Sequence, residues 1–314
     1  TGFARIVDNG IQVLILTGSG AYVFDTDANT FTTSTDPYLT LATQCTVIDG
    51  YGLFAETNSQ RLRVTEPYDF LTIDASDFAS AEGLPDNVTG VYSLNREAWI
   101  FGERSAEIWF NTGAANFPFE RNSNTFIEFG LAAVNSVAKL DGALYWVGRG
   151  TDGRANIYRA SGYQPEIIAH HGIAAILEAQ DKAGGLAEAY AFAYRERGHA
   201  FYVVTLPTAE RTLVYDPVSQ AWHERSYLDP ALLREVHHLA RYSVTFQGKT
   251  IVACRNNTLC EMSEDILTDL GQPIILTRSC PVVHGDQQTL SMSAFELLIQ
   301  TGVGTATGQG ISPT

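Results

Sequence analysis

The chain has 314 residues, of which 45% are hydrophobic and 18% are charged, and its mean hydropathy is -0.04. This composition is typical of a globular protein with a sizeable core, and it excludes a disordered chain. The formal net charge is -15, and the sequence shows no stripe of basic residues. This excludes a protein that binds nucleic acid through its phosphate groups.

A repeated hairpin signal runs along most of the chain. Two-residue turn signals, most of them ending in glycine, are each followed by an alternating apolar run, as at Asp49-Gly50 before YGLFAE. The second residues of the six turns stand at positions 10, 50, 96, 142, 198 and 248. Their spacing of 40 to 56 residues is in the range of one propeller blade, about 40–50 residues.

A second landmark keeps the same phase. In each unit a strand ends in an aromatic or apolar anchor, and seven residues later another large residue opens a fourth strand, most clearly at Phe24…Phe31 and Tyr215…Trp222. Such small sheets bury their faces by stacking radially. We therefore predict an all-β propeller of about six four-stranded blades over residues 1–272. An array of immunoglobulin-like sandwiches is the structural competitor, and its repeat nearer 100 residues does not fit the spacing.

Two segments depart from the repeat. Residues 172–179 have helical periodicity and are followed by Gly184-Gly185, which predicts a helical insertion over about 172–186, between the fourth and fifth blades. After about residue 269 the rhythm is lost. Residues 273–281 and 293–300 are predicted as strands and 301–310 as a glycine-rich loop. We assign 273–314 to the start of a second β domain that is cut short, and we expect a seventh blade to be possible in a longer protein.

The histidines and cysteines do not indicate a metal site. Doublets occur at His170-His171 and His237-His238, but neighbouring residues on a strand point to opposite faces. Single histidines stand at 199, 223 and 284, and the cysteines stand at 45, 254, 260 and 280 without CxxC spacing. Cys254 and Cys260 flank a turn, and in one interpretation they lie near each other across a hairpin. We prefer the interpretation that the cysteines are buried, reduced thiols.

Other candidate motifs have structural explanations. Asp25-x-Asp27-x-Asn29 is similar to the opening of a calcium loop, but Thr30 replaces the required glycine, so a β-turn is favoured. The segment 17–20 is glycine-rich where a hairpin turn is due. Carboxylate pairs occur at Glu103 with Glu107 and at Asp74 with Asp77, as they do by chance in an acidic chain.

The sequence contains no catalytic signature of the common kinds. It has no Gly-x-Ser-x-Gly elbow, no Gly-x-Gly-x-x-Gly opening a helix and no Ser-x-Asp-x-Gly-x-x-Trp turn of the sialidases. No stretch of about 18 apolar residues indicates a membrane span. We predict that the protein is not an enzyme, and we name no catalytic, cofactor-binding or metal-ligating residue and no cofactor.

The middle of the chain resembles a known family. Residues 97–109 (EAWIFGERSAEIW), 135–139, 144–146 and 157–163 are similar to blades of the packaged-DNA stabilisation proteins, tail accessory or hub proteins of short-tailed phages and prophages. Residues 295–304 are similar to the family's entry into a second β domain. The resemblance covers roughly residues 10–305.

The resemblance implies a structural function. Such a protein would sit in the virion tail after assembly in the host cytoplasm, complete the channel below the portal and help to retain packaged DNA. The implied partners are other tail proteins, namely the portal or adaptor, the tail needle and the tailspike, with several copies of the chain per virion. DNA would be only the content of a channel to which it does not adhere, since the net charge is negative. No membrane partner is implied.

Two other functions remain as alternatives. A carbohydrate-active or other ligand-binding propeller attached to a tail predicts carboxylates and aromatic side chains that converge at the mouth of the ring. A kelch-like protein-interaction module of cellular origin is the weaker alternative.

Overall fold

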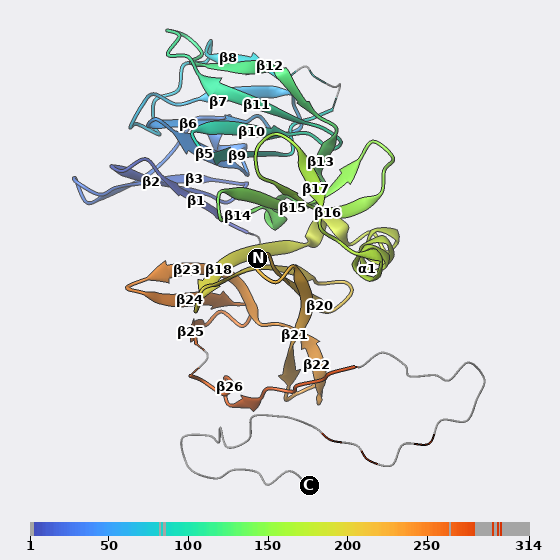
Figure 1. Ribbon diagram of the computed structural model, residues 1–314. Coiled ribbons are helices and arrows are strands. Elements are labelled where there is room, and N and C mark those ends of the chain that lie inside the picture. The colour runs from blue at the N-terminus through green and yellow to red at the C-terminus, as the bar shows by residue number, and fades with distance from the viewer. Residues whose placement is uncertain are drawn as a thin grey trace.

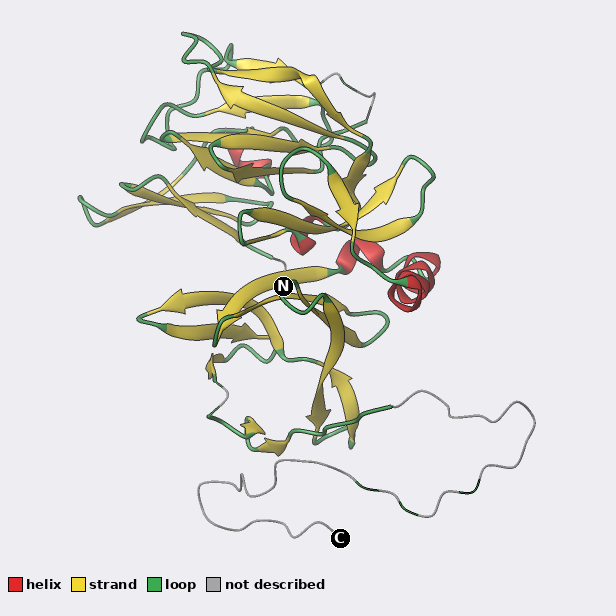
Figure 2. Cartoon of the chain, viewed as in Figure 1, coloured by secondary structure: helices red, strands yellow, loops and turns green. Residues whose placement is uncertain are grey.

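Six antiparallel sheets follow one another along the chain in the computed structural model and form the blades of a β-propeller (Figures 1 and 2). The structure describes residues 3–279 except 82, 84, 85 and 264, and in addition the single residues 291, 294 and 296. The predicted fold class is confirmed. The predicted strand 293–300 and loop 301–310 lie outside the described residues, apart from those single positions, and the domain boundary at 272/273 stays a prediction.

The first three blades each have four strands in simple up-and-down order. Blade 1 comprises β1 (Arg5–Asp8), β2 (Gln12–Leu16), β3 (Ala21–Asp25) and β4 (Thr30–Thr33). Blade 2 comprises β5 (Cys45–Ile48), β6 (Tyr51–Ala55), β7 (Arg61–Val64) and β8 (Phe78–Ser80). Blade 3 comprises β9 (Gly90–Leu94), β10 (Glu97–Phe101), β11 (Ala106–Asn111) and β12 (Phe119–Ile127).

The last three blades differ from the predicted four strands. Blade 4 comprises β13 (Phe129–Leu131), β14 (Ala138–Leu140), β15 (Ala143–Gly150), β16 (Ala155–Ala160) and β17 (Pro165–Ile167). Blade 5 comprises β18 (Tyr190–Glu196), β19 (His199–Leu206), β20 (Arg211–Asp216), β21 (Ala221–Asp229) and β22 (Arg234–His237). Blade 6 comprises β23 (Ala240–Phe246), β24 (Lys249–Cys254) and β25 (Leu259–Met262), followed by the short pair β26 (Thr268–Asp269) and β27 (Gln272–Pro273).

These differences have local causes. In blade 4 both β13 and β14 pair with β15, because a 3-10 turn at Val134–Ser136 divides the inner strand. The Ser136 hydroxyl replaces backbone hydrogen bonds at the break between β13 and β14. Its Oγ donates to the Ala133 carbonyl and accepts from the Val147 amide at 2.9 Å. After Met262 the chain leaves blade 6, and β27 contacts β21 of blade 5 instead of adding a fourth strand.

The predicted two-residue turns set the hairpins. Both turn residues have positive φ at five of the six sites, including Asp49 (52°) with Gly50 (89°) and Asn95 (50°) with Arg96 (64°). Positive φ at both central residues defines the type I′ turn, whose twist matches that of paired strands. The first turn differs, because only Gly10 has positive φ there, and the side chain of Asn9 accepts a hydrogen bond from the Gln12 amide at 2.7 Å.

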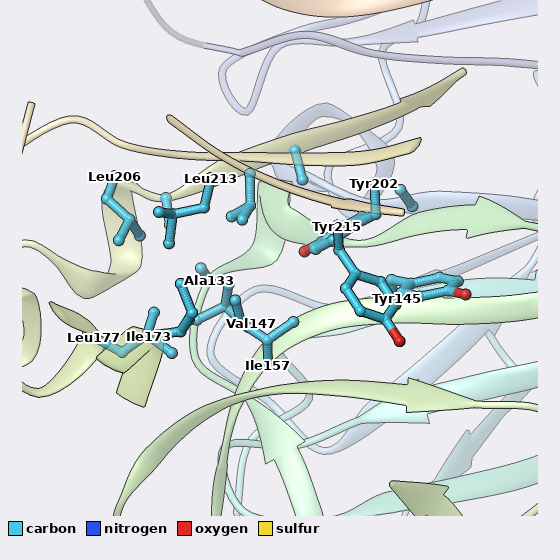
Figure 3. Close-up of a cluster of buried hydrophobic side chains, with 14 of the residues drawn as sticks. Ala133, Tyr145, Val147, Ile157, Ile173, Leu177, Tyr202, Leu206, Leu213 and Tyr215 are labelled. Carbon is cyan, nitrogen blue, oxygen red and sulfur yellow. The ribbon is translucent and has the colours of Figure 1, made fainter. Parts of the chain in front are cut away.

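The predicted helical insertion is confirmed as α1 (His171–Lys182), followed by a 3-10 turn at Leu186–Glu188. His170 caps its first turn by accepting from the Gly172 amide at 3.1 Å. Ile173 and Leu177 enter the buried cluster between blades 4 and 5 (Figure 3). The helix therefore closes the outer side of that interface.

Five hydrophobic clusters hold the blades together, one between each pair of consecutive blades. The cluster between blades 3 and 4 contains Trp99, Phe101 and Trp146, with the Phe101 and Trp146 ring centroids 5.2 Å apart. In the described part of the chain no such cluster joins blade 6 to blade 1. We call this junction the seam.

The strand predicted over residues 273–281 is wrong within the described residues. Pro273 ends β27, and residues 274–279 have no secondary structure. Ile274, Ile275 and Leu276 are 47%, 45% and 92% exposed. Their apolar pattern indicated a strand, but no neighbouring sheet in the described residues accepts them.

Candidate functional surfaces at the seam and the axis

The seam face of blade 1 is apolar and open. Side chains alternate along its strands, so that Leu14 is buried against blade 2 while Ile15 points to the seam. Ile6 pairs with Ile15 across the strands, and Tyr22 stacks on Phe31 with ring centroids 5.8 Å apart. Ile6 and Phe31 are each 61% exposed. The face is built like the interior of a blade interface but lacks a partner sheet in the described structure.

The seam face of blade 6 has the same character. Val252 and Cys254 are buried toward blade 5, and the alternate residues of β23 and β24 point to the seam. Val244 pairs with Ile251 and is 61% exposed. Phe246 on the same face is also 61% exposed, and a salt bridge of 2.7 Å between Lys249 and Glu261 borders it.

Within the described residues, Phe3 links the two sides of the seam near the axis of the ring. The Phe3 ring lies 5.5 Å from the Tyr242 ring of blade 6 and 5.7 Å from the Tyr190 ring of blade 5. Further out the apolar side chains remain exposed, and contiguous exposed apolar surface marks a site of protein contact.

Two cations, Arg5 and Lys139, lie on the inner strands of different blades. The Arg5 guanidinium lies 5.3 Å from the Tyr92 ring centroid, and its Nε donates to the Cys45 carbonyl at 3.3 Å. Lys139 Nζ donates to Ser93 Oγ at 2.9 Å. Burial, and then the charge of Arg5, lower the pKa of Lys139. Arg5 and Lys139 therefore lie on inner strands of different blades, and the charge of one acts on the other.

The candidate histidines serve the fold. His199 Nδ1 lies 2.9 Å from the carboxylate of Asp216, and His238 Nδ1 accepts from the Ala240 amide at 3.2 Å. His223 lies beside Arg225 on the outer strand of blade 5, and His284 lies outside the described residues. Among the residues that the structure describes, no three His, Cys, Asp or Glu side chains are placed to hold a metal ion.

The calcium-like segment and the glycine-rich segment are hairpin turns. Asp25 Oδ1 accepts from the Asp27 and Ala28 amides at 3.1 and 2.8 Å, and these bonds lower its pKa, the Ala28 amide most. In the segment 17–20, the Thr17 amide donates to the Gly20 carbonyl at 3.0 Å. Both turn interpretations are confirmed.

The described cysteines are free thiols. Cys45 and Cys254 are buried, whereas Cys260 is half-buried. Cys254 and Cys260 lie on adjacent strands of blade 6 and face blade 5, so they are near each other across the hairpin as one interpretation expected. Burial raises the pKa of Cys254 to about 11, which suppresses its thiolate at neutral pH.

The carboxylate pairs do not form an acid–base site. Glu107 is buried and accepts from Trp109 Nε1 at 2.8 Å and from the Gly83 amide at 2.5 Å. Asp74 and Asp77 line a small hollow with Glu66 at the outer part of blade 2. Hydrogen bonds from Ser76 lower the pKa of Asp74, whereas a general acid requires a raised pKa.

The cations at the axis had no recognisable sequence signal. Arg5 and Lys139 are isolated basic residues on short inner strands, with no repeated motif around them. Their position relative to the hairpin turns indicates that they lie on inner strands. The turns do not indicate toward which face of the sheet a side chain points.

The fold and these surfaces define a β-propeller with an exposed apolar seam and no assembled catalytic group among the described residues. The chain belongs to the family described as bacteriophage P22 Gp10, beta-propeller, whose model matches residues 5–266. The resemblance seen in the sequence is thereby confirmed, and the family is one of phage structural proteins. None of the curated proteins compared with the chain matches it.

Solved structures share the fold at low identity. Dihydro-heme d1 dehydrogenase NirN, in complex with DHE, has a TM-score of 0.52 and 12% identity over 84% of this chain and 54% of its own. The WD40 domain of Neurospora crassa Pan2 has a TM-score of 0.50 and 7% identity over 81% of this chain and 72% of its own. The chain thus spans about half the length of NirN, and these likenesses show the propeller fold alone.

None of the helices in the described residues is long and apolar enough to cross a membrane.

Proposed function

We propose that the protein is a non-enzymatic component of a phage tail, a hub or accessory factor that completes the channel between portal and tail and helps to retain packaged DNA. The observation that carries the proposal is the family match over residues 5–266, which takes in nearly the whole propeller. The proposed partners are the portal or adaptor, the tail needle, the tailspike and further copies of the chain. The proposed location is the virion tail, after assembly in the host cytoplasm.

The physical properties of the ring support a structural function. Its six sheets are joined by five dense apolar interfaces, which suits a rigid structural component of an assembly. The net charge of -15 disfavours adhesion of DNA to its surface. The exposed apolar faces at the seam suit burial in protein contacts.

Deletion of the gene from its phage tests the proposal. We expect particles that package DNA, lose it after assembly, and lack the distal part of the tail by electron microscopy. A plasmid copy of the gene should restore complete tails, and a copy carrying Gly153→Ala, a surface turn variant, should do so as well. Mutant particles with full heads and complete tails would contradict the proposal.

A further inference from the structure

Four polar side chains from blades 5 and 6 meet at one end of the inner strands. Tyr190 begins β18, His237 ends β22, Arg241 is in β23, and Arg255 follows β24. The Arg255 amide donates to the Leu239 carbonyl at 2.9 Å, and the Arg241 guanidinium lies 5.9 Å from the centroid of the Tyr190 ring. We call Tyr190, His237, Arg241 and Arg255 the cationic cluster.

Three members of the cationic cluster have a buried nitrogen without a hydrogen-bond partner among the described residues, namely Nδ1 of His237 and the Nε atoms of Arg241 and Arg255. The Tyr190 hydroxyl interacts with the side chains of Thr205 and Arg241. Leaving a buried nitrogen of this kind unsatisfied is unfavourable. Three of them in one place indicate that a group from outside the described structure satisfies them.

The charges in the cationic cluster are not neutralised locally. No described carboxylate forms a salt bridge with Arg241 or Arg255, although the chain carries 35 acidic residues. The nearby Glu210 is bound by both terminal nitrogens of Arg234. Because Arg234 binds both carboxylate oxygens of Glu210, this carboxylate does not pair with Arg241 or Arg255. The cationic cluster therefore keeps the positive charges of these two arginines.

The backbone and the aromatic neighbours orient Arg241. The register of β23 against β24 shifts between Ala240 and Tyr242, which makes Arg241 the bulged residue, and a bulge re-aims its side chain. The guanidinium lies between two rings, 5.8 Å from the Phe3 centroid and 5.9 Å from that of Tyr190. These contacts hold the cation without supplying an anion.

The pKa values of His237 and Tyr190 are shifted by burial and by the two neighbouring positive charges. Burial, and then the charge of Arg255, lower the pKa of His237 to about 4, with a smaller lowering from Arg241 and an opposing effect from Glu210. Burial raises the pKa of Tyr190, while hydrogen bonds with Thr205 and Arg241 and the charges of Arg241 and Arg255 oppose that rise. At neutral pH the imidazole is therefore neutral and the phenol is a hydrogen-bond donor.

We propose that the cationic cluster is a binding site for a tetrahedral oxyanion of the phosphate class. Two guanidinium groups match the charge of a doubly negative anion, and charge-assisted N–H···O bonds are the strong ones. The phenol and the imidazole add two neutral donors, which a tetrahedral anion with four oxygens accommodates. This site does not depend on the proposed tail function.

Sulfate is the sharpest probe, because it stays doubly negative between pH 5 and 8 and so cannot itself cause a pH dependence. Binding would raise the pKa of His237, since the anion favours the imidazolium beside it. Sulfate should therefore bind more tightly as pH falls from 7 to 5. Arg241, Arg255, Arg234 and Glu210 keep their charges over that range, and His238, which also faces the site, adds positive charge only toward its low end.

The test is thermal unfolding and calorimetric titration of the chain with sodium sulfate, sodium phosphate and sodium acetate, against sodium chloride at equal ionic strength. We expect sulfate and phosphate to bind at least tenfold more tightly than acetate. Arg241→Gln and Arg255→Gln should each weaken sulfate binding at least tenfold, and the double variant should abolish it. Arg195→Gln, which removes a cation paired with Asp141 elsewhere on blade 5, is the matched control and should bind like the wild type.

Sulfate also stabilises proteins without binding to a site, and the double variant measures that background. A sulfate-dependent shift as large in the double variant as in the wild type would overturn the proposal, and so would equal affinity for acetate. A readout that needs no variant is the His237 pKa followed by NMR. It should rise by about one unit in saturating sulfate, and an unchanged value would also overturn the proposal.

Discussion

The backbone of Gly130 lies directly against the backbone of Arg104. A Cβ atom on Gly130 would come within 2.2 Å of the Arg104 nitrogen and of the Glu103 carbonyl carbon. The Gly130 carbonyl also accepts from the Trp146 indole at 3.1 Å. Blades 3 and 4 therefore meet here at a distance that only glycine allows.

Gly130→Ala should consequently destabilise the protein by about 3 kcal/mol, because rotation of a side chain cannot relieve a clash with backbone. Urea unfolding followed by tryptophan fluorescence measures the loss. Gly153→Ala is the control, since Gly153 has a φ of 77° but no atom within 4 Å of its ideal Cβ, and left-handed strain alone costs roughly 1–2 kcal/mol. Equal losses in the two variants would mean that the blades move apart at little cost.

Val244 and Val252 test whether the seam is open in solution. They lie on adjacent strands of blade 6 and on opposite faces, 61% and 4% exposed. Val252→Ala should cost about 2 kcal/mol, because it removes buried methyl groups from the interface with blade 5. Val244→Ala should cost less than about 0.5 kcal/mol. If the two losses measured by urea unfolding are the same, the seam is covered in solution.

Arg63 and Glu56 form a buried ion pair in blade 2. Their Nε and Oε1 atoms are 2.5 Å apart, and the side chains are 2% and 14% exposed. Arg63 also donates to the Ala75 carbonyl at 3.0 Å and lies 3.5 Å from the Tyr38 ring centroid. Arg63→Met should destabilise the protein by about 3 kcal/mol, since it leaves a carboxylate in a poorly hydrated place.

A double-mutant cycle with Glu56→Gln separates the pair from the packing. Because the two side chains are in direct contact, we expect a coupling energy of at least about 1.5 kcal/mol. A coupling near zero would show that Arg63 acts through its other contacts, the Ala75 carbonyl and the Tyr38 ring.

His238 should make the protein less stable in mild acid. Its Nδ1 accepts the Ala240 amide, so the ring must stay neutral, and burial followed by the charge of Arg225 lowers its pKa to about 4. The unfolded state binds the proton more readily, with a pKa near 6.5. Stability is therefore complete above pH 6.5 and falls as pH drops toward 4, by up to about 3 kcal/mol for this group.

The variant His238→Asn keeps an acceptor near the Ala240 amide but does not titrate. Its unfolding free energy, measured in urea at several pH values, should change less between pH 6.5 and 4.5 than that of the wild type. His237 contributes in the same direction, so some dependence should remain. An identical slope in the two proteins would contradict the assignment to His238.

Local sequence signals predicted most of the fold because they act over a few residues. The Asp-Gly turn at 49–50 and the Asp216 turn, where the carboxylate accepts from the Val218 amide at 2.9 Å, are set by neighbouring residues. The helix at 171–182 followed from its periodicity. The number of strands in blades 4 to 6 did not follow, because it depends on pairing between distant segments such as β13 with β15.

The cationic cluster and the seam could not be predicted from the sequence for a related reason. Arg241 stands next to Tyr242 on one strand, and only the bulge decides which of them turns inward. The seam was hidden as well, since Ile15 and Val244 follow the same alternation as strands whose two faces are both covered. Alternation predicts that a face is apolar, whereas the placement of the neighbouring sheet decides whether it is buried.

The seam changes how the propeller should come apart. Blades 2 to 5 each contact two neighbours through a buried cluster, whereas blades 1 and 6 each contact one. Unfolding of such a stack begins at its ends, because an end blade loses a single interface when it opens. Amide hydrogens of β2 and β24 should then exchange with solvent before those of β10 and β15, and a protein bound across the seam would make the six blades unfold as one cooperative unit.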